Sequence, residues 1–232
     1  MTRLSHDTLV IFLFVCYIEI RGDDVPKKTF ENLSKEKKKK IFNAAVQEFS
    51  NARYTEASIN QIIKTAEISR GSFYQYFQNK EDIYLYMITE IGKQKMEVIG
   101  RTEELNPEAD FFEIYLIMFK EGLRWARTNP DYYRVGLLME LDDSQFIIKL
   151  REMAAEGMKN LIILIERDKQ RGLIKPEVDS KLVVEMLYTL NMNLLMNDFK
   201  SGQEENMEKR FTDMVEIIRG GIARVKGKEP QV

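Results

Sequence analysis

Between residues 58 and 80 the chain concentrates side chains that can hydrogen-bond to a nucleic acid. An arginine can present two donors to a guanine edge, and an amide is a weaker candidate for a base contact. Hydroxyl and ammonium groups can bind phosphate oxygens, and a glycine lets the backbone approach closely. The residues with these properties are Ser58, Ser69, Arg70, Gly71, Ser72, Tyr74, Gln75, Tyr76 and Lys80.

The apolar residues of the same stretch predict two short helices joined by a turn. Ser58 is a suitable N-cap for the first helix, and Ser69 is one for the second. Phe73 and Phe77 lie one turn apart and are expected to face inward, which leaves the polar residues of 70–77 on the outside. The apolar stripe of the first helix has the spacing i, i+3, i+4 and i+7 and consists of Ile59, Ile62, Ile63 and Ala66.

The stretch SRGSFYQYFQNKEDIY is similar to the recognition region of the TetR family of transcriptional regulators. One departure falls at 66–68, where the family often has Ala-Gly-Val and this chain has Ala-Glu-Ile. The residues that carry the resemblance are Ser58, Ser69, Gly71, Phe73, Tyr74, Tyr76, Phe77, Lys80 and Glu81.

The resemblance implies a helix-turn-helix whose recognition helix spans about 70–77. Arg70 is then the main candidate for a base contact, and Tyr74 is expected at a thymine methyl or a phosphate. Ser58, Tyr76 and Lys80 are expected at phosphates. The alternative is that this stretch belongs to an all-helical core in which the tyrosines are packing residues.

Charge is distributed unevenly along the chain. Residues 27–80 contain 11 basic and 5 acidic side chains, whereas residues 81–232 contain 22 basic and 28 acidic ones. Such asymmetry is expected when one module meets phosphates. The run Lys37 to Lys40, taken alone, is equally consistent with a solvated charged face.

The scarcity of histidine and cysteine argues against an enzyme. Cys16 is the single cysteine and His6 the single histidine, so neither a disulfide within the chain nor a His/Cys metal site is expected. We therefore expect no cofactor, and cysteine usage fits a cytoplasmic protein.

Residues 1–24 differ in character from the rest. Their apolar stretch from Thr8 to Ile20 is shorter than the roughly 20 residues that a membrane-spanning helix needs. We interpret residues 1–24 as a leader that is non-native or translated from an upstream start. A membrane-associated leader and a cloning or annotation artefact are the alternatives.

The remaining sequence predicts an all-α fold of about nine helices. Residues 27–80 form the expected helix-turn-helix DNA-binding domain, beginning with a helix from about Ser34. Residues 81–228 form the expected helical domain for effector binding and dimerisation. Its predicted helices lie at about 81–100, 108–128, 130–140, 143–171, 178–200 and 204–225.

Two sets of residues in the expected helical domain of 81–228 bear on mechanism. The last two helices carry apolar stripes that could form a homodimer interface, as the resemblance implies, with Leu190, Leu194, Phe211, Met214 and Ile218 as candidates. Large side chains concentrated at 111–139 are consistent either with ordinary core or with an apolar effector pocket. The pocket candidates are Tyr115, Phe119, Trp125, Tyr133, Met139 and, further on, Tyr188.

These features favour a homodimeric repressor that binds a palindromic double-stranded DNA operator and responds to a small hydrophobic effector. A non-enzymatic helical binding or adaptor protein without specific DNA recognition is the runner-up. Sequence-specific retention of DNA separates the two hypotheses.

Overall fold

The computed structural model describes residues 25–99, 108–155, 158–201 and 206–222, so the predicted leader lies outside the described residues. These residues form eleven α-helices and contain no β-strand, which confirms the all-α prediction. They fall into two compact units, called here the N-terminal unit (25–99 and 122–155) and the C-terminal unit (the remaining described residues). Within the described residues, no helix is long and apolar enough to cross a membrane.

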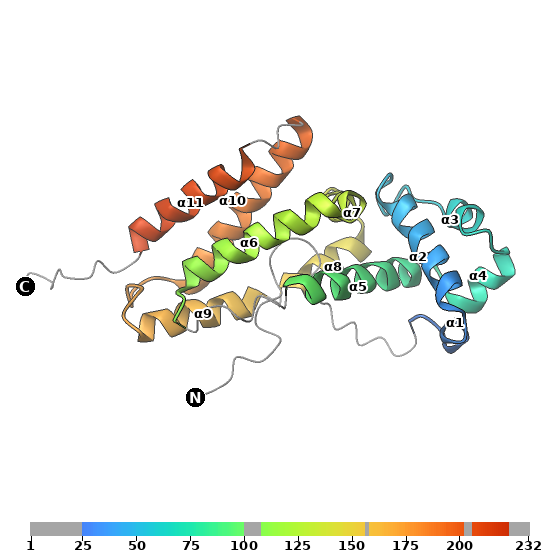
Figure 1. The fold of residues 1–232 in the computed structure, drawn as a ribbon, viewed down its shortest axis with the longest axis horizontal. Coiled ribbons are helices and arrows are strands. Elements are labelled where there is room, and N and C mark those ends of the chain that lie inside the picture. The colour runs from blue at the N-terminus through green and yellow to red at the C-terminus, as the bar shows by residue number, and fades with distance from the viewer. Residues whose placement is uncertain (1–24, 100–107, 156–157, 202–205, 223–232) are drawn as a thin grey trace, which may run out of the picture. The chain divides into compact units, whose positions relative to one another are not determined.

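The N-terminal unit contains the predicted helix-turn-helix and is larger than the predicted head of residues 27–80. Figure 1 shows α1 beside α4 and α2 beside α3. Its helices are α1 (Lys28–Glu31), α2 (Lys35–Phe49), α3 (Ile59–Thr65), α4 (Arg70–Tyr76), α5 (Lys80–Ile99), α7 (Pro130–Glu140) and α8 (Gln145–Ala155), with the end of α6 (Phe111–Thr128).

The C-terminal unit holds the first part of α6 together with three further helices. The sequence analysis expected one helix over 143–171, whereas the structure describes two helices in this range, α8 and α9. Residues 156–157, between these two helices, lie outside the described residues. The helices of this unit are α9 (Lys159–Gln170), α10 (Ser180–Ser201) and α11 (Met207–Ile222).

An aromatic core holds the N-terminal unit together. Phe73 and Phe77 are fully buried, as their spacing predicted. Phe30, on the unpredicted helix α1, is 1% exposed and packs edge-on against Tyr76 and Tyr86, with ring centroids 5.8 and 4.8 Å apart. Helix α1 is therefore part of the packed head, although the sequence analysis expected the first helix only from about Ser34.

A second aromatic cluster forms the core of the C-terminal unit. Phe211 is fully buried, with its ring stacked 3.4 Å from that of Phe119 and 5.4 Å from that of Tyr115. The prediction that Phe211 faces a partner subunit is therefore wrong. The apolar stripe of α11 could not reveal this, because periodicity shows which face is apolar but not what covers it.

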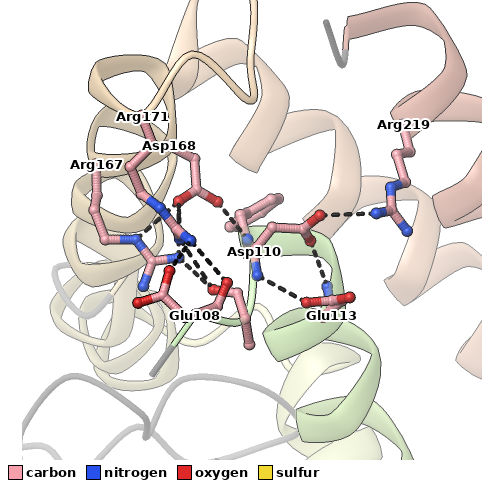
Figure 2. A network of polar contacts seen from close by, with 9 residues as sticks. Glu108, Asp110, Glu113, Arg167, Asp168, Arg171 and Arg219 are labelled. Atoms are coloured by element: carbon pink, nitrogen blue, oxygen red, sulfur yellow. Dashed lines mark hydrogen bonds and ion pairs between the residues drawn. The ribbon is translucent and has the colours of Figure 1, made fainter. Parts of the chain in front are cut away.

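A buried carboxylate network fixes the start of α6 (Figure 2). Asp168 is fully buried and accepts hydrogen bonds from the Phe111 backbone N–H at 2.6 Å, from Arg167 Nε at 2.8 Å and from Arg171 at 3.0 Å. Figure 2 also shows Asp110 turned towards Arg219, to which it pairs at 2.8 Å. A buried charge is tolerated only when it is paired in this way.

The turn between α3 and α4 contains a residue in the left-handed region. Glu67 has a φ of 51°, and its carboxylate pairs with the Lys40 ammonium. This is the position at which the resembling family often has glycine, which adopts positive φ without steric strain. Glu67 therefore adopts a backbone conformation that glycine would adopt without strain.

We expect the positive φ of Glu67 to determine which substitutions at this position lower the stability of the protein. Glu67→Gly should leave the thermal midpoint near or above that of the wild type, because relief of strain offsets the greater entropy of the unfolded chain. Glu67→Val should lower the midpoint by roughly 4 °C or more, since a β-branched residue is disfavoured at positive φ. Lys40→Gln, which removes only the exposed ion pair, is the matched control and should change little. Equal midpoints for the Gly and Val variants would contradict this account.

Candidate nucleic-acid interface

The helix α4 is held in place by its N-cap residue and by its buried face. The Ser69 side chain accepts a hydrogen bond from the Ser72 backbone N–H at 3.0 Å, which confirms the predicted N-cap. Phe73 and Phe77 anchor the opposite face in the core. A capped helix with one face fixed presents its other face in a single orientation.

Four residues of α4 are exposed on that outer face. Arg70, Gly71, Tyr74 and Gln75 all have high exposure, and Tyr74 is 40% exposed. The Arg70 guanidinium lies 5.9 Å from the centroid of the Tyr74 ring, a cation–π distance that restrains an otherwise flexible side chain. The face therefore offers one partly ordered bidentate donor, one amide and one aromatic hydroxyl.

Gly71 is exposed in the first turn of α4, and glycine has a lower helix propensity than alanine. A Cβ at this position would meet the Ser69 hydroxyl oxygen at 3.8 Å, which is an ordinary contact. The described residues therefore leave room for a side chain here. Close approach of another molecule to the backbone gives a reason for glycine that packing within the protein does not.

Of the three predicted phosphate contacts, the structure buries Tyr76 and engages Lys80 within the protein, whereas it leaves Ser58 exposed. Ser58 occupies the N-cap position of α3 but its side chain caps no backbone group, and its own N–H donates to Glu48 Oε1 at 2.7 Å. Tyr76 is only 6% exposed and packs on Phe30, so the expectation that it faces outward is wrong. Its burial depends on α1, which the sequence pattern did not predict.

The Lys80 side chain donates hydrogen bonds to backbone carbonyls of the same chain. Its ammonium donates to the Ala57 carbonyl at 3.0 Å and the Thr55 carbonyl at 3.3 Å, and lies 4.7 Å from the centroid of the Tyr54 ring. Burial lowers the pKa of Lys80 more than the nearby Asp142 and Glu48 carboxylates raise it. We therefore correct the phosphate role predicted for Lys80 to a structural one.

The lysine run at the start of α2 is partly engaged. Lys38 pairs with Glu31 at 2.8 Å, Lys40 pairs with Glu67, and the Lys37 ammonium lies 5.7 Å from the centroid of the Tyr76 ring. Lys37 therefore lies beside the C-terminal end of α4, and Lys40 lies beside the turn between α3 and α4. The run is thus neither wholly a solvated face nor wholly available to phosphates.

A buried carboxylate in the turn after α7 accepts hydrogen bonds from the loop that precedes the helix-turn-helix. Asp142 is 1% exposed and accepts hydrogen bonds from the Thr55 N–H at 2.9 Å, the Thr55 hydroxyl at 2.8 Å and the Ser144 N–H at 2.9 Å. Burial alone would raise the pKa of Asp142, but the hydrogen bonds from Ser144 and Thr55 outweigh burial and lower it. The loop that leads into α3 is therefore tied to the α7–α8 turn.

The six candidate pocket residues are divided between the two compact units. Tyr115 and Phe119 pack on Phe211 in the C-terminal unit, whereas Trp125 and Met139 are 7% and 6% exposed in the core of the N-terminal unit. The ordinary-core interpretation fits these four residues. The remaining two candidates are half-buried and belong to different units: Tyr133 and Tyr188.

The exposed apolar residues of α10 differ in part from the predicted interface. Leu190 is 41% exposed, as an interface residue of an isolated protomer should be, and Leu194 is half-buried. Met214 and Ile218 on α11 are half-buried too. Exposed large apolar residues in the same two helices that sequence analysis did not select are Leu182 at 52%, Met186 at 45% and Ile217 at 76%.

Known proteins resemble this chain in sequence and fold. Residues 41–87 match the model of the family described as bacterial regulatory proteins, tetR family. An uncharacterized HTH-type transcriptional regulator of Bacillus subtilis (strain 168), YdgC, is 26% identical over 155 residues, which are 66% of this chain and 75% of the relative. The fatty acid metabolism regulator protein of the same organism is 25% identical over 192 residues, covering 78% of this chain and 93% of its own length.

The fold agrees with that of a solved regulator. The crystal structure of a TetR family transcriptional regulator from Chloroflexus aurantiacus J-10-FL superposes with a TM-score of 0.65 and 24% identity. The superposition covers 87% of this chain and 100% of the Chloroflexus chain.

The Asp142 contacts predict a pH-dependent contribution to stability. Asp142→Asn should lower the free energy of unfolding by about 1–3 kcal/mol at pH 7, because an amide presents a donor where the carboxylate accepts. The stabilisation is complete above the ordinary pKa of 3.8 and is lost as the pH falls through the lower pKa of the folded state. Urea unfolding from neutral pH to about pH 3 measures the difference, which should shrink only below the ordinary pKa. Asp143→Asn, at a neighbouring carboxylate with 94% side-chain exposure, should be nearly silent.

Proposed function

Because this chain belongs to the TetR family of transcriptional regulators, which are not enzymes, we propose that it is a homodimeric repressor released from a palindromic operator by a small apolar effector. Its two α4 helices would enter successive major grooves about 34–36 Å apart. The outer face of α4 is the observation that carries this proposal. Such a protein acts on DNA in the cytoplasm.

On that face Arg70 is the proposed reader of a guanine, with Gln75 as a second base contact. Tyr74 would contact a thymine methyl or a phosphate, and Ser58 and Ser72 would bind phosphates. Gly71 supports this arrangement, because a glycine without an intramolecular reason fits a backbone that closely approaches the groove.

The exposed stripe of α10 and its neighbour on α11 would form the contact with a second copy. Leu182, Met186 and Leu190 recur every four residues and therefore share one face of α10. Ile217, at 76% exposure, is a further exposed apolar residue on α11, the helix that packs against α10. Contiguous exposed apolar surface on a protein is typical of an interaction site.

Two considerations support the effector: the name of one relative, and the thermodynamic coupling between effector binding and DNA release. A regulator of fatty acid metabolism is among the similar proteins, which favours an apolar small molecule. Any effector must bind one body conformation more tightly than the other in order to release DNA. The Asp142 to Thr55 contacts offer a route by which the α7–α8 turn affects the loop before α3.

Selection of bound DNA from a random pool with the purified chain tests the function. Recovery of an inverted repeat would support the repressor, whereas unselective or absent retention would favour the adaptor alternative. Addition of medium-length and long-chain fatty acids or their thioesters to the selected complex then tests the effector class.

Arg70 should read sequence and not only charge. Arg70→Ala is expected to weaken the best site by about 1–3 kcal/mol and relax selectivity at one base pair per half-site. Arg70→Lys is the matched control, because it keeps the charge while losing the bidentate fork. It should lose selectivity but keep the dependence of binding on salt. Binding isotherms at three salt concentrations, on the selected site and a one-base variant, measure both; equal weakening of all sequences by Arg70→Ala would make Arg70 a phosphate contact.

The dimer prediction contrasts exposed and buried apolar residues. Met186→Arg or Leu190→Arg should weaken the dimer by several kcal/mol, about 100-fold or more in Kd, because the interface would bury an unpaired charge. The thermal unfolding of the protomer should change little. Phe211→Arg should instead unfold the C-terminal unit. Sedimentation at low micromolar concentration, with the exposed Gln145→Arg as control, distinguishes these results; dimers that persist in both α10 variants would place the interface elsewhere.

A further inference from the structure

The recognition helix α4 ends in three carbonyl groups that need partners from outside the helix. A helix leaves the carbonyls of its last turn without intrahelical donors. In α4 the Phe73 carbonyl accepts from the Phe77 N–H at 2.9 Å. The carbonyls that remain belong to Tyr74, Gln75 and Tyr76.

Two residues at the start of α1 supply donors for all three carbonyls. Lys27 Nζ donates to the Tyr74 carbonyl at 2.9 Å, and the Lys27 backbone N–H donates to the Tyr76 carbonyl at 3.0 Å. The Thr29 hydroxyl donates to the Gln75 carbonyl. The Lys27 cation also lies at the negative end of the helix dipole, where a positive charge is favourable.

These donors are held by the core rather than by a loose arm. Phe30, one residue beyond Thr29, is 1% exposed, and its ring lies 5.3 Å from that of Phe77. Glu31, at the end of α1, pairs with Lys38 of α2 at 2.8 Å. The donor groups of Lys27 and Thr29 are therefore fixed relative to the other helices of the head.

We propose that Lys27 and Thr29 are positioning residues for sequence readout, acting through the last turn of α4. This inference rests on the proposed function of α4. The last turn carries Tyr74 and Gln75 on its exposed face, and hydrogen bonds to base edges depend on angle and distance. Contacts to phosphates position a protein without reading sequence, so loosening this turn should reduce selectivity more than general affinity.

Thr29 gives the cleanest test, because it carries no charge. Thr29→Val removes the hydroxyl while nearly preserving shape. The ratio of affinities for the selected site and a one-base variant should fall about 3- to 10-fold per half-site, the range expected for one lost hydrogen bond. The salt dependence should stay unchanged, because no charge is removed. Thr29→Ser retains the donor and should restore the ratio.

Lys27 is tested with Lys27→Met, which keeps the length of the side chain, and with Lys27→Arg, which keeps a donor and the charge. The Met variant should lose selectivity with an unchanged salt slope, and the Arg variant should recover it. A slope reduced by about one unit per half-site, with selectivity retained, would make Lys27 a phosphate ligand and overturn its positioning role.

Two controls separate failure of this inference from failure of the proposed function. If the wild type does not discriminate between sequences, α4 is not a base reader and the proposed function fails. If the wild type discriminates and Arg70→Ala reduces discrimination while Thr29→Val does not, only the positioning inference fails.

A measurement without DNA completes the test. Hydrogen exchange of the backbone amides at 74–78 should be at least about 3-fold faster in Thr29→Val than in the wild type, while the amides of α3 keep their rates. Unchanged exchange in the last turn of α4 would overturn the proposal. A general increase across the head would mean that Thr29 supports overall stability, which also contradicts a local role.

Discussion

A helix of seven residues is too short to be stable in water by itself, and this constraint governs the head of the protein. Each part of α4 is therefore held by something outside the helix. Ser69 satisfies a backbone N–H at its start, and burial of Phe73 and Phe77 fixes its inner face. Lys27 and Thr29 satisfy carbonyls at its end. With both ends and one face held, the outer face is left free of structural duties and can serve recognition.

Each compact unit also contains a nearly or fully buried carboxylate that ties backbone groups together. Asp142 joins the turn after α7 to Thr55, and Asp168 joins the end of α9 to the first residue of α6. A buried carboxylate is destabilising unless its oxygens are satisfied, so its partners must keep their places. Networks of this kind specify one arrangement of helix ends more sharply than apolar packing, which tolerates small displacements.

The parts of the fold that sequence could predict are those that depend on nearby residues. The cap at Ser69 and the burial of Phe73 follow from spacing within one helix. The fates of Tyr76, Lys80 and Phe211 depend on partners far along the chain, and no periodicity reveals these partners. Tyr76 is covered by Phe30, 46 residues earlier, and the side-chain donors that end α4 lie 46 and 47 residues before their acceptors. Helix α1 itself spans four residues, too few for a periodic pattern to show.

Two residues of the helix-turn-helix break local rules in opposite directions. Glu67 occupies a position with positive φ that favours glycine, and Gly71 occupies a helical position that favours most other residues. For Glu67 the structure supplies a partial compensation, because its carboxylate pairs with Lys40 beside the turn. For Gly71 the nearest atom among the described residues is 3.8 Å from a hypothetical Cβ, so packing gives no reason for the missing side chain. Departures from local preference that the protein itself does not explain concentrate at functional sites. Under the proposed function, Gly71 is therefore where DNA would come closest to the backbone of α4.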